Sequence, residues 1–397
     1  MAARSSLRAA FLWIFRIEYM KNINFFVLLA AFAAALSSCG TGTADHDDDD
    51  TVPSVKSLVL RASATVIEAD GIDAVQLEVF ADGVPVTEGV RLYDGLTNTP
   101  LELPSMTFTT TEPGNYYFWA AYGTKQTEMV QVRAVGFELP ELPADPEPEN
   151  TSFVKRVLLT QFTGTECGFC PGMIEILRSV LADEDYASRV IHTAAHTYKS
   201  TDPAYLEQRL DQAMGVSGYP TVVADMAYSY DNYLDEDGFR QMIDLAWSEL
   251  PAKAGISVST SLAGNQLVVM ASVKAAETGM YSVGAWLLED GIEGKQANYH
   301  PELWTGDYGI HDNCIRYADS RVTNIDYSGF SLGTVEAGQT SEYVFTIDLD
   351  EDWVADNCHV VVFVTVPDEK GRYYSVTNAV DVPLEGTYPF EYASSAE

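Results

Sequence analysis

The chain has 397 residues, of which 47% are hydrophobic, and a formal net charge of -35. Single hydrophobic cores stop growing at roughly 250–300 residues, so this length predicts two or three domains. The excess of acidic side chains would repel the phosphates of a nucleic acid, which excludes nucleic-acid binding. Five cysteines are too few for a disulfide-built scaffold of this size, so each needs its own explanation.

An apolar run at residues 23–36 follows Lys21 and ends at small residues, which is the pattern of a secretory signal. A helical membrane span needs ~20 residues, so the run is too short to cross a bilayer. The segment Leu36-Ser37-Ser38-Cys39 resembles the bacterial lipobox, in which the cysteine is lipidated and becomes the mature N-terminus. We therefore expect a lipoprotein signal peptide over residues 1–39 and membrane attachment through a lipid on Cys39. A plain signal peptide is the alternative.

Met20 is a simpler start than Met1, because it places a short basic start directly before the apolar run. Residues 40–53 are small and acidic and cannot form a core, so we expect a flexible tether. The acidic run at 45–50 resembles surface-export signals of some Gram-negative lipoproteins, which implies display on the cell surface. A solvated spacer is the alternative for this run.

Residues 54–137 show short alternating runs separated by turn signals, as in Val75–Phe80 before the turn at Asp82-Gly83. This spacing predicts a β-sandwich. The turn at 69–71 and the strand start at Gly114 resemble bacterial Ig-like repeats, which implies a spacer or a binding module. Residues 138–151 carry alternating prolines and glutamates, and we expect a semi-rigid linker with polyproline II geometry.

Residues 152–252 alternate between strand and helix character, which predicts an α/β sheet. The expected strands cover 154–159, 189–196 and 220–223, and the expected helices cover 173–181 and 237–250. Strand patterns return from residue 253 to 397 and predict a second β-sandwich. The predicted fold class is thus a multidomain chain with an α/β domain between two β-sandwiches.

The motif Cys167-Gly168-Phe169-Cys170 follows a predicted strand and opens a predicted helix. A thiolate at a helix N-terminus is stabilised by unpaired backbone N–H groups and by the helix dipole, which lowers the thiol pKa. In such a pair the first cysteine attacks and the second resolves the mixed disulfide. The spacing therefore points to thiol–disulfide chemistry.

Zinc is the competing interpretation of these cysteines. A structural zinc site needs four ligands, usually as two close pairs, and Cys314 and Cys358 provide no second pair. His192 and His196 lie on one predicted strand. We therefore predict neither a metal nor a cofactor at this motif.

Pro220 begins a predicted strand, where proline usually marks a special turn or a cis bond. The order of strand, C-x-x-C, helix and x-Pro-Thr is similar to thioredoxin. This resemblance implies that Cys167 is the nucleophile, Cys170 the resolving thiol and Pro220 the substrate-facing cis-proline. It places Tyr219 and Phe169 near the site.

Two positions depart from the thioredoxin pattern. Gln161 stands where thioredoxin has a buried acid, so a proton acceptor for the resolving thiol is missing. Glu166 replaces the tryptophan before the first cysteine, and a carboxylate there disfavours the thiolate. A structural disulfide in an inherited fold is the alternative to a reactive one.

Four short segments resemble the outer-membrane-protein-28-related lipoprotein family, at residues 161–164, 215–221, 286–291 and 356–361. The likeness covers about residues 150–385 and implies an outer-membrane lipoprotein. The leading function is thus a thiol–disulfide oxidoreductase acting on cysteine-containing envelope proteins. A non-enzymatic surface binding protein or adhesin is the alternative.

The two remaining cysteines, Cys314 and Cys358, are most simply a disulfide that staples the last sandwich, since an exported compartment permits one. Their spacing does not establish that pairing. His300, His311 and Asp312 lie near Cys314 in sequence; packing or surface roles are favoured for them over a metal site.

Overall fold

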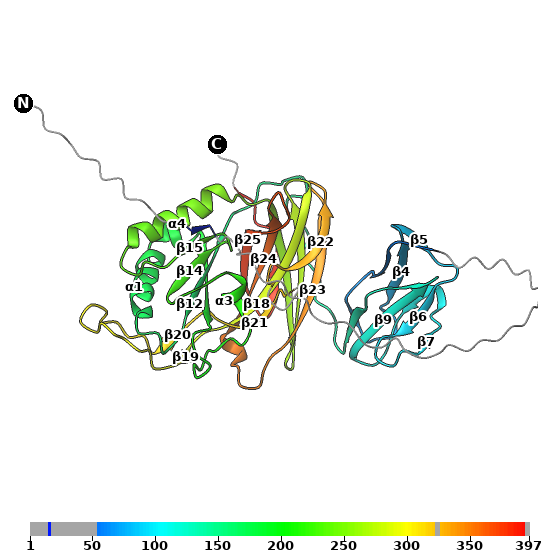
Figure 1. Cartoon of the computed structure of the whole chain (residues 1–397), viewed down its shortest axis with the longest axis horizontal. Helices are drawn as coiled ribbons and strands as arrows, with labels where there is room; N and C mark the ends of the chain where they lie inside the picture. The colour runs from blue at the N-terminus through cyan, green and yellow to red at the C-terminus, as the bar shows by residue number, and fades with distance from the viewer. Residues whose placement is uncertain (1–14, 17–53, 322–325, 394–397) are drawn as a thin grey trace, which may run out of the picture. The chain divides into compact units, whose positions relative to one another are not determined.

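The computed structural model describes residues 54–321 and 326–393, together with the backbone of strand β1 (Phe15–Arg16) (Figure 1). The chain divides between Phe137 and Glu138 into two compact units. The predicted signal peptide (1–39), the start at Met20, the lipidation site Cys39 and the tether (40–53) lie outside the described residues, apart from β1.

The first unit consists of two sheets around one core. One sheet holds β2 (Leu58–Ala62), β4 (Val75–Ala81), β5 (Val84–Val86) and β8 (Thr107–Phe108). The other holds β3 (Val66–Glu68), β11 (Val130–Val135), β9 (Gly114–Tyr122), β6 (Arg91–Asp94), β7 (Pro100–Leu101) and β10 (Lys125–Gln126). The 3-10 turn η1 (Pro104–Met106) precedes β8. Alternate residues of β4 are buried, as the period of a half-buried strand requires.

The second unit is built on one long mixed sheet, with the strand order β1-β15-β14-β12-β13-β21-β18-β24-β25 and with β22 beside β18. These strands are β15 (Tyr228–Tyr230), β14 (Thr221–Ala224), β12 (Val157–Thr163), β13 (Val190–His196), β21 (Cys314–Asp319), β18 (Gly279–Glu289), β24 (Cys358–Pro367), β25 (Tyr374–Pro383) and β22 (Phe330–Val335). β12 and β13 run parallel, and β14 is antiparallel to β12.

Helices cover one face of the sheet around β12. They are α1 (Cys170–Leu181), α2 (Glu184–Ala187) and α4 (Glu236–Glu249), and the short α3 (Leu210–Ala213) follows β13. The core beneath α1 and α4 contains Val157 and Leu159 of β12 with Met173 and Phe239. Leu158 and Phe162 of the same strand face a second core on the opposite side of the sheet, because successive side chains of a strand point to opposite faces.

A second layer packs against the far half of the long sheet. Its four strands are β23 (Thr340–Asp348), β17 (Gln266–Ala275), β16 (Ala254–Ala263) and β26 (Gly386–Tyr388). The shared core includes Ile256, Val269, Val283 and Val362. Two short strands, β19 (Ile292–Glu293) and β20 (Ile310–His311), pair with each other, and the 3-10 turn η2 (Ala355–Asn357) precedes β24.

The predicted boundary between residues 252 and 253 does not separate two sheets. β13 pairs in parallel with β21 through Ala194 and Cys314, so strands from both sides of the boundary share one sheet. Their side chains also share one core, in which Phe162 and Trp286 are both fully buried. The α/β portion and the last sandwich are consequently fused into the single compact unit that begins at Glu138.

The proline-rich segment at 138–151 lies against the second unit. The Lys274 ammonium donates to the Asp145 carboxylate at 2.9 Å and to the carbonyl of Pro148 at 2.6 Å. The Ser259 hydroxyl donates to the carbonyl of Glu141 at 2.6 Å. The Lys274 side chain is only 2% exposed, so these acceptors take the place of the water molecules that would otherwise hydrate its ammonium group. A segment expected to be a semi-rigid spacer is therefore held along the surface of β16 and β17.

Within the described part of the chain, no helix combines the length and apolar character needed to span a membrane.

Candidate functional site: a covered disulfide

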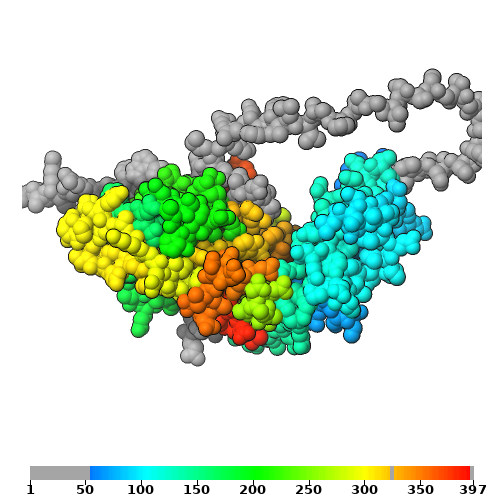
Figure 2. Space-filling view, turned by 90° about the horizontal axis from the view of Figure 1, so that it is seen from below, coloured from blue at the N-terminus to red at the C-terminus, as the bar shows by residue number. Residues whose placement is uncertain are grey.

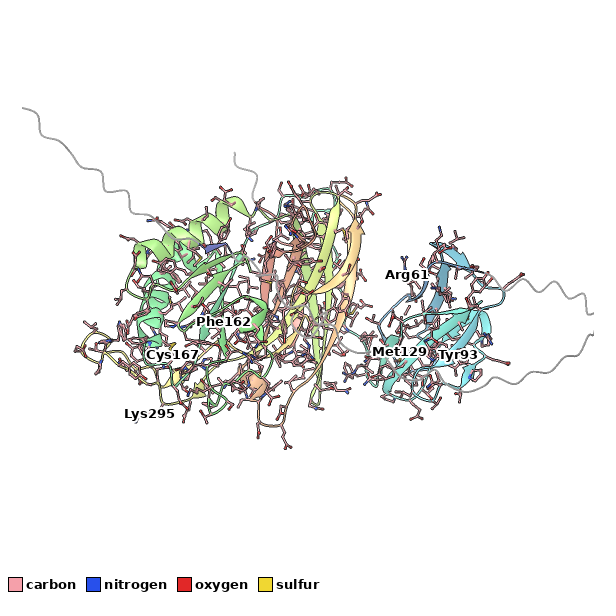
Figure 3. All side chains as sticks on the ribbon, viewed as in Figure 1. Arg61, Tyr93, Met129, Phe162, Cys167 and Lys295 are labelled. Carbon is pink, nitrogen blue, oxygen red and sulfur yellow. A yellow bond between two sulfur atoms is a disulfide. The ribbon has the colours of Figure 1, made fainter. Side chains whose placement is uncertain are left out.

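Cys167 and Cys170 form a disulfide with their Cα atoms 5.4 Å apart. β12 ends at Thr163, a short loop follows, and α1 begins at Cys170. The loop is folded back on itself, because the Cys167 N–H donates to the carbonyl of Gly164 at 3.0 Å. Figure 3 labels Cys167 in this loop. A strand precedes the motif and a helix follows it, as the sequence predicts, but β12 runs three to four residues later than the predicted strand at 154–159 and α1 begins at Cys170 and not at residue 173.

Pro220 lies at the same edge of the sheet as the disulfide loop. The Tyr219–Pro220 peptide bond is cis, as the sequence predicts for a proline at this position. Phe162 of β12 pairs with Thr221 of β14, so Pro220 comes just where β12 ends and the chain turns toward Cys167. The Tyr219 hydroxyl lies 2.9 Å from the hydroxyl of Thr197. Burial of Tyr219 raises the pKa of its phenol.

The two departures from the thioredoxin pattern have different surroundings. Gln161 is buried, and its amide Nε2 has no hydrogen-bond partner among the described residues. An amide cannot accept the proton that a resolving thiol must lose. Glu166 is exposed and accepts a hydrogen bond from the Thr201 hydroxyl. Its carboxylate is thus held by Thr201 at the surface, next to Cys167 in the chain.

The buried pair of His196 and Asp202 supports the loop that carries the disulfide, through the backbone N–H of Thr165. Sequence reasoning missed this pair. The Nδ1 atom of His196, at the end of β13, lies 2.9 Å from the Asp202 carboxylate. The same carboxylate accepts from the backbone N–H of Thr165 at 2.6 Å and from that of Ala204 at 2.9 Å. Burial would raise the pKa of Asp202, but these hydrogen bonds lower it to about 2. Asp202 is therefore a carboxylate that fixes the loop two residues before Cys167.

A loop at residues 294–309, here called the cover, lies over the disulfide motif. Its backbone N–H groups at Ala297 and Tyr299 donate to the carbonyls of Thr165 at 2.6 Å and Gly168 at 2.9 Å. The Gln296 amide donates to the carbonyl of Cys167 at 2.9 Å. About 130 positions separate the partners, so no local pattern in the sequence indicated this contact.

Aromatic rings surround the exposed edge of the motif. Phe169 is 36% exposed, and its ring stacks on Tyr233 at 5.5 Å and meets Tyr299 edge-on at 5.2 Å. The His300 ring lies 5.9 Å from that of Phe169. Trp304 packs edge-on against Tyr233 at 5.8 Å. His300 thus has a packing role here, as its sequence position favours.

Cys314 and Cys358 correct one prediction: they are buried free cysteines and do not form a disulfide. Both lie opposite Glu289 of the strand β18, one on each side of it. Neighbouring strands are about 4.8 Å apart, which separates the two Cα atoms by roughly twice that distance. A disulfide needs about 4.4–6.8 Å between Cα atoms, so the intervening strand prevents the bond.

The histidines near Cys314 lie in separate contacts. His311 Nε2 lies 3.1 Å from the carbonyl of Gly294, and its ring meets that of His196 edge-on at 5.0 Å. His192 is half-buried, and desolvation lowers the pKa of its imidazole to about 4. The Asp312 carboxylate accepts from the N–H of Gly291. Among the described residues, no group of three or more His, Cys, Asp or Glu side chains is placed to hold a metal ion.

Residues 207–385 match the model of the family described as outer membrane protein Omp28. The match covers less than half of the chain and lies within the second unit. It supports the resemblance that the sequence segments indicate, and the family's name implies an outer membrane location. Curated proteins give no match to this sequence.

Two solved structures are similar to parts of the chain. HBP35 of Porphyromonas gingivalis shares 19% sequence identity at a TM-score of 0.48, covering 62% of this chain and 79% of that one. A protein from Agrobacterium tumefaciens shares 14% identity at a TM-score of 0.37, covering 58% of this chain and 94% of that one.

Proposed function

We propose that the protein is an outer-membrane lipoprotein whose Cys167–Cys170 disulfide exchanges with cysteine-containing proteins of the cell envelope. The observation that carries the proposal is the placement of this disulfide at the start of α1, at the sheet edge where the cis-proline Pro220 enters β14. The Omp28 match over residues 207–385 supports the location.

The order of elements supports a thioredoxin-like arrangement around the disulfide. β12 lies between β13 and β14, and α1 and α4 cover the face of β12 that bears Val157 and Leu159. A sulfur at the N-terminus of a helix is well placed to leave as a thiolate, because unpaired N–H groups stabilise its charge. In the proposed exchange, a partner thiolate attacks Cys167, the sulfur–sulfur bond breaks, and Cys170 leaves with the electron pair.

The membrane anchor is proposed from the sequence around Cys39. Metabolic labelling with radioactive palmitate tests it: we expect the wild-type protein to carry the label and Cys39→Ser to lose it. Proteinase digestion of intact cells then tests surface display, and complete protection would place the protein on the periplasmic face.

A non-enzymatic binding protein with a structural disulfide is the second candidate, and two observations favour it. Cys167 is only 4% exposed and Cys170 is fully buried, so neither sulfur is freely offered to a partner. The first unit has two sheets around one core, which supports an Ig-like spacer or binding module over residues 54–137.

Reduction of insulin by dithiothreitol separates the two candidates. If the disulfide is exchanged, the wild-type protein accelerates insulin precipitation and Cys167→Ser does not. Cys358→Ser is the matched control, because it removes a buried thiol that is outside the disulfide. Equal rates for the wild type and Cys167→Ser would reject the oxidoreductase and leave the binding protein.

A further inference from the structure

The cover is a long excursion of the chain that closes on itself at a narrow neck. β19 pairs with β20, with Ile292 opposite His311 and Glu293 opposite Ile310. The N–H of Gly294 adds a bond to the carbonyl of Gly309 at 3.0 Å. A loop whose two ends are joined in this way can move as one piece about its neck. Figure 1 shows this yellow loop beyond β19 and β20.

The tip of the cover reaches the disulfide motif itself. The Tyr299 ring lies so close to Gly168 that a Cβ at that glycine would clash with it. Gln296 donates to the carbonyls of both Cys167, at 2.9 Å, and Gly164, at 3.2 Å. The backbone bonds from Ala297 and Tyr299 complete this contact.

The cover is also fixed along α1. The Trp304 ring packs so closely on Gly172 that a Cβ there would be 2.6 Å from it. The Arg178 guanidinium donates to the carbonyl of Asp307 at 2.9 Å, and the Tyr308 hydroxyl donates to Glu175. Figure 2 shows the yellow part of the chain at the surface beside the green part.

The burial of both cysteines has a chemical consequence. Thiol–disulfide exchange requires a thiolate to reach the attacked sulfur, so the rate depends on access. Cys167 is 4% exposed while the cover is in place, and Phe169, between the two cysteines, is the exposed member of the motif. The cover contacts the carbonyls of Cys167 and Gly168, so it lies directly against the backbone of the motif.

We propose that the cover is an autoinhibitory lid, which must swing away from the motif about its β19–β20 neck before Cys167 can exchange with a thiol. The inference deepens the proposed function but does not require a protein substrate, because reduction by a small dithiol measures access directly. One thiolate of dithiothreitol attacks Cys167, and Cys170 leaves as a thiolate. The second thiol of the reagent then displaces Cys167, so two electrons pass from the reagent to the cysteine pair.

The test measures the rate at which dithiothreitol reduces the disulfide in the folded full chain, with maleimide trapping and mass spectrometry. Gln296→Ala removes one hydrogen bond to the motif, at Cys167, and one to Gly164 in the loop before it, and Tyr299→Ala removes the ring over Gly168. A typical intramolecular hydrogen bond corresponds to a factor of about five in an equilibrium constant. We therefore expect Gln296→Ala, which loses two hydrogen bonds, to be reduced about 25-fold faster than the wild type. We expect Tyr299→Ala, which loses ring packing and no hydrogen bond, to be reduced about tenfold faster, which corresponds to ~1.4 kcal/mol less stability of the closed cover.

Leu303→Ala is the matched control, because its side chain is exposed on the same loop. We expect it to be reduced at the wild-type rate. Amide hydrogen exchange checks that the variants stay folded: exchange at Ala297 and Tyr299 should speed up, while β12 keeps its protection.

Two results would overturn the lid. One is reduction of the folded wild type as fast as that of the chain unfolded in guanidinium. The other is an unchanged rate in both Gln296→Ala and Tyr299→Ala. Failure of the proposed function looks different: the variants would be reduced faster by dithiothreitol, yet insulin would still not be turned over.

Discussion

Asp202 shows at the scale of a single residue how a buried charge holds the disulfide loop. Its carboxylate accepts hydrogen bonds from His196 and from the backbone of Thr165 and Ala204. An ionised carboxylate with several donors is stabilised in spite of burial, and the pKa of Asp202 falls to about 2. Because the folded state lowers this pKa, the ionised group contributes stability above the ordinary aspartate pKa.

We expect Asp202→Asn to lower the free energy of unfolding by about 2 kcal/mol at pH 7, since it weakens hydrogen bonds to a charged group. In the wild type, the contribution of Asp202 to the free energy of unfolding should be fully present above about pH 4. It should be lost as the pH falls toward 2. Urea unfolding between pH 2 and 7 measures both effects. Asp185→Asn, at an exposed position on α2, serves as the control. A difference between wild type and Asp202→Asn that does not shrink on acidification would contradict this assignment.

Local sequence signals located part of the site but not its supports. Cys167, Cys170 and Pro220 stand out because a C-x-x-C pair and a proline at a strand start are local patterns. Asp202 is 37 positions from Thr165, and nothing in its neighbours marks it as the partner of that N–H. The sequence therefore indicates the cysteine pair and its proline, while the residues that hold them depend on the fold.

The segment at 138–151 shows at the scale of an element how one buried cation changes the behaviour of a linker. The Lys274 ammonium has four acceptors, namely the Asp145 carboxylate, the carbonyls of Glu147 and Pro148, and the Tyr392 hydroxyl. Composition favours an extended chain here, because proline-rich segments cannot form ladders. Whether such a chain is free or bound depends on Lys274, which lies far away in sequence on β17.

Lys274→Met should release this segment, because methionine keeps much of the apolar stem and removes the donor. We expect endoproteinase Glu-C to cleave after Glu141 or Glu149 about tenfold faster in the variant, since cleavage requires local release of the chain. Lys370→Met changes an exposed lysine and should leave the cleavage rate unchanged. Equal protection in Lys274→Met and the wild type would show that other contacts hold the segment.

The whole molecule is organised by the sheet that joins the α/β portion to the last sandwich. β21 pairs with β13 on one side and β18 on the other, and Trp286 and Phe363 pack at 4.8 Å in the core that also contains Phe162. Because the two portions share one core, neither can unfold without exposing the other's buried side chains. Both portions should therefore unfold in one cooperative transition. The unit at 54–137 has its own core and should unfold separately.

Differential scanning calorimetry of the full chain should therefore show two transitions. Trp286→Ala, at a fully buried site, should lower the stability of the second unit by about 3–5 kcal/mol and leave the first unit unchanged. Phe118→Ala should have the reverse effect, because Phe118 lies in the core of the first unit. Three independent transitions would contradict the fusion of residues 152–252 with 253–397.

From the sequence alone one could locate the approximate order of strands and helices around the cysteine pair and its proline, although β12 (Val157–Thr163) begins later than the predicted strand at 154–159. Alternation, helical spacing and turn residues act over a few positions, so they reveal local structure of this kind. The acidic character of the chain also follows from the sequence, because it depends only on composition. Tertiary structure alone decided that β18 separates Cys314 from Cys358, that β13 and β21 fuse two predicted domains, and that the cover lies on the disulfide. These contacts join residues that are tens to more than a hundred positions apart in the chain. A sequence pattern that spans a few residues therefore cannot predict them.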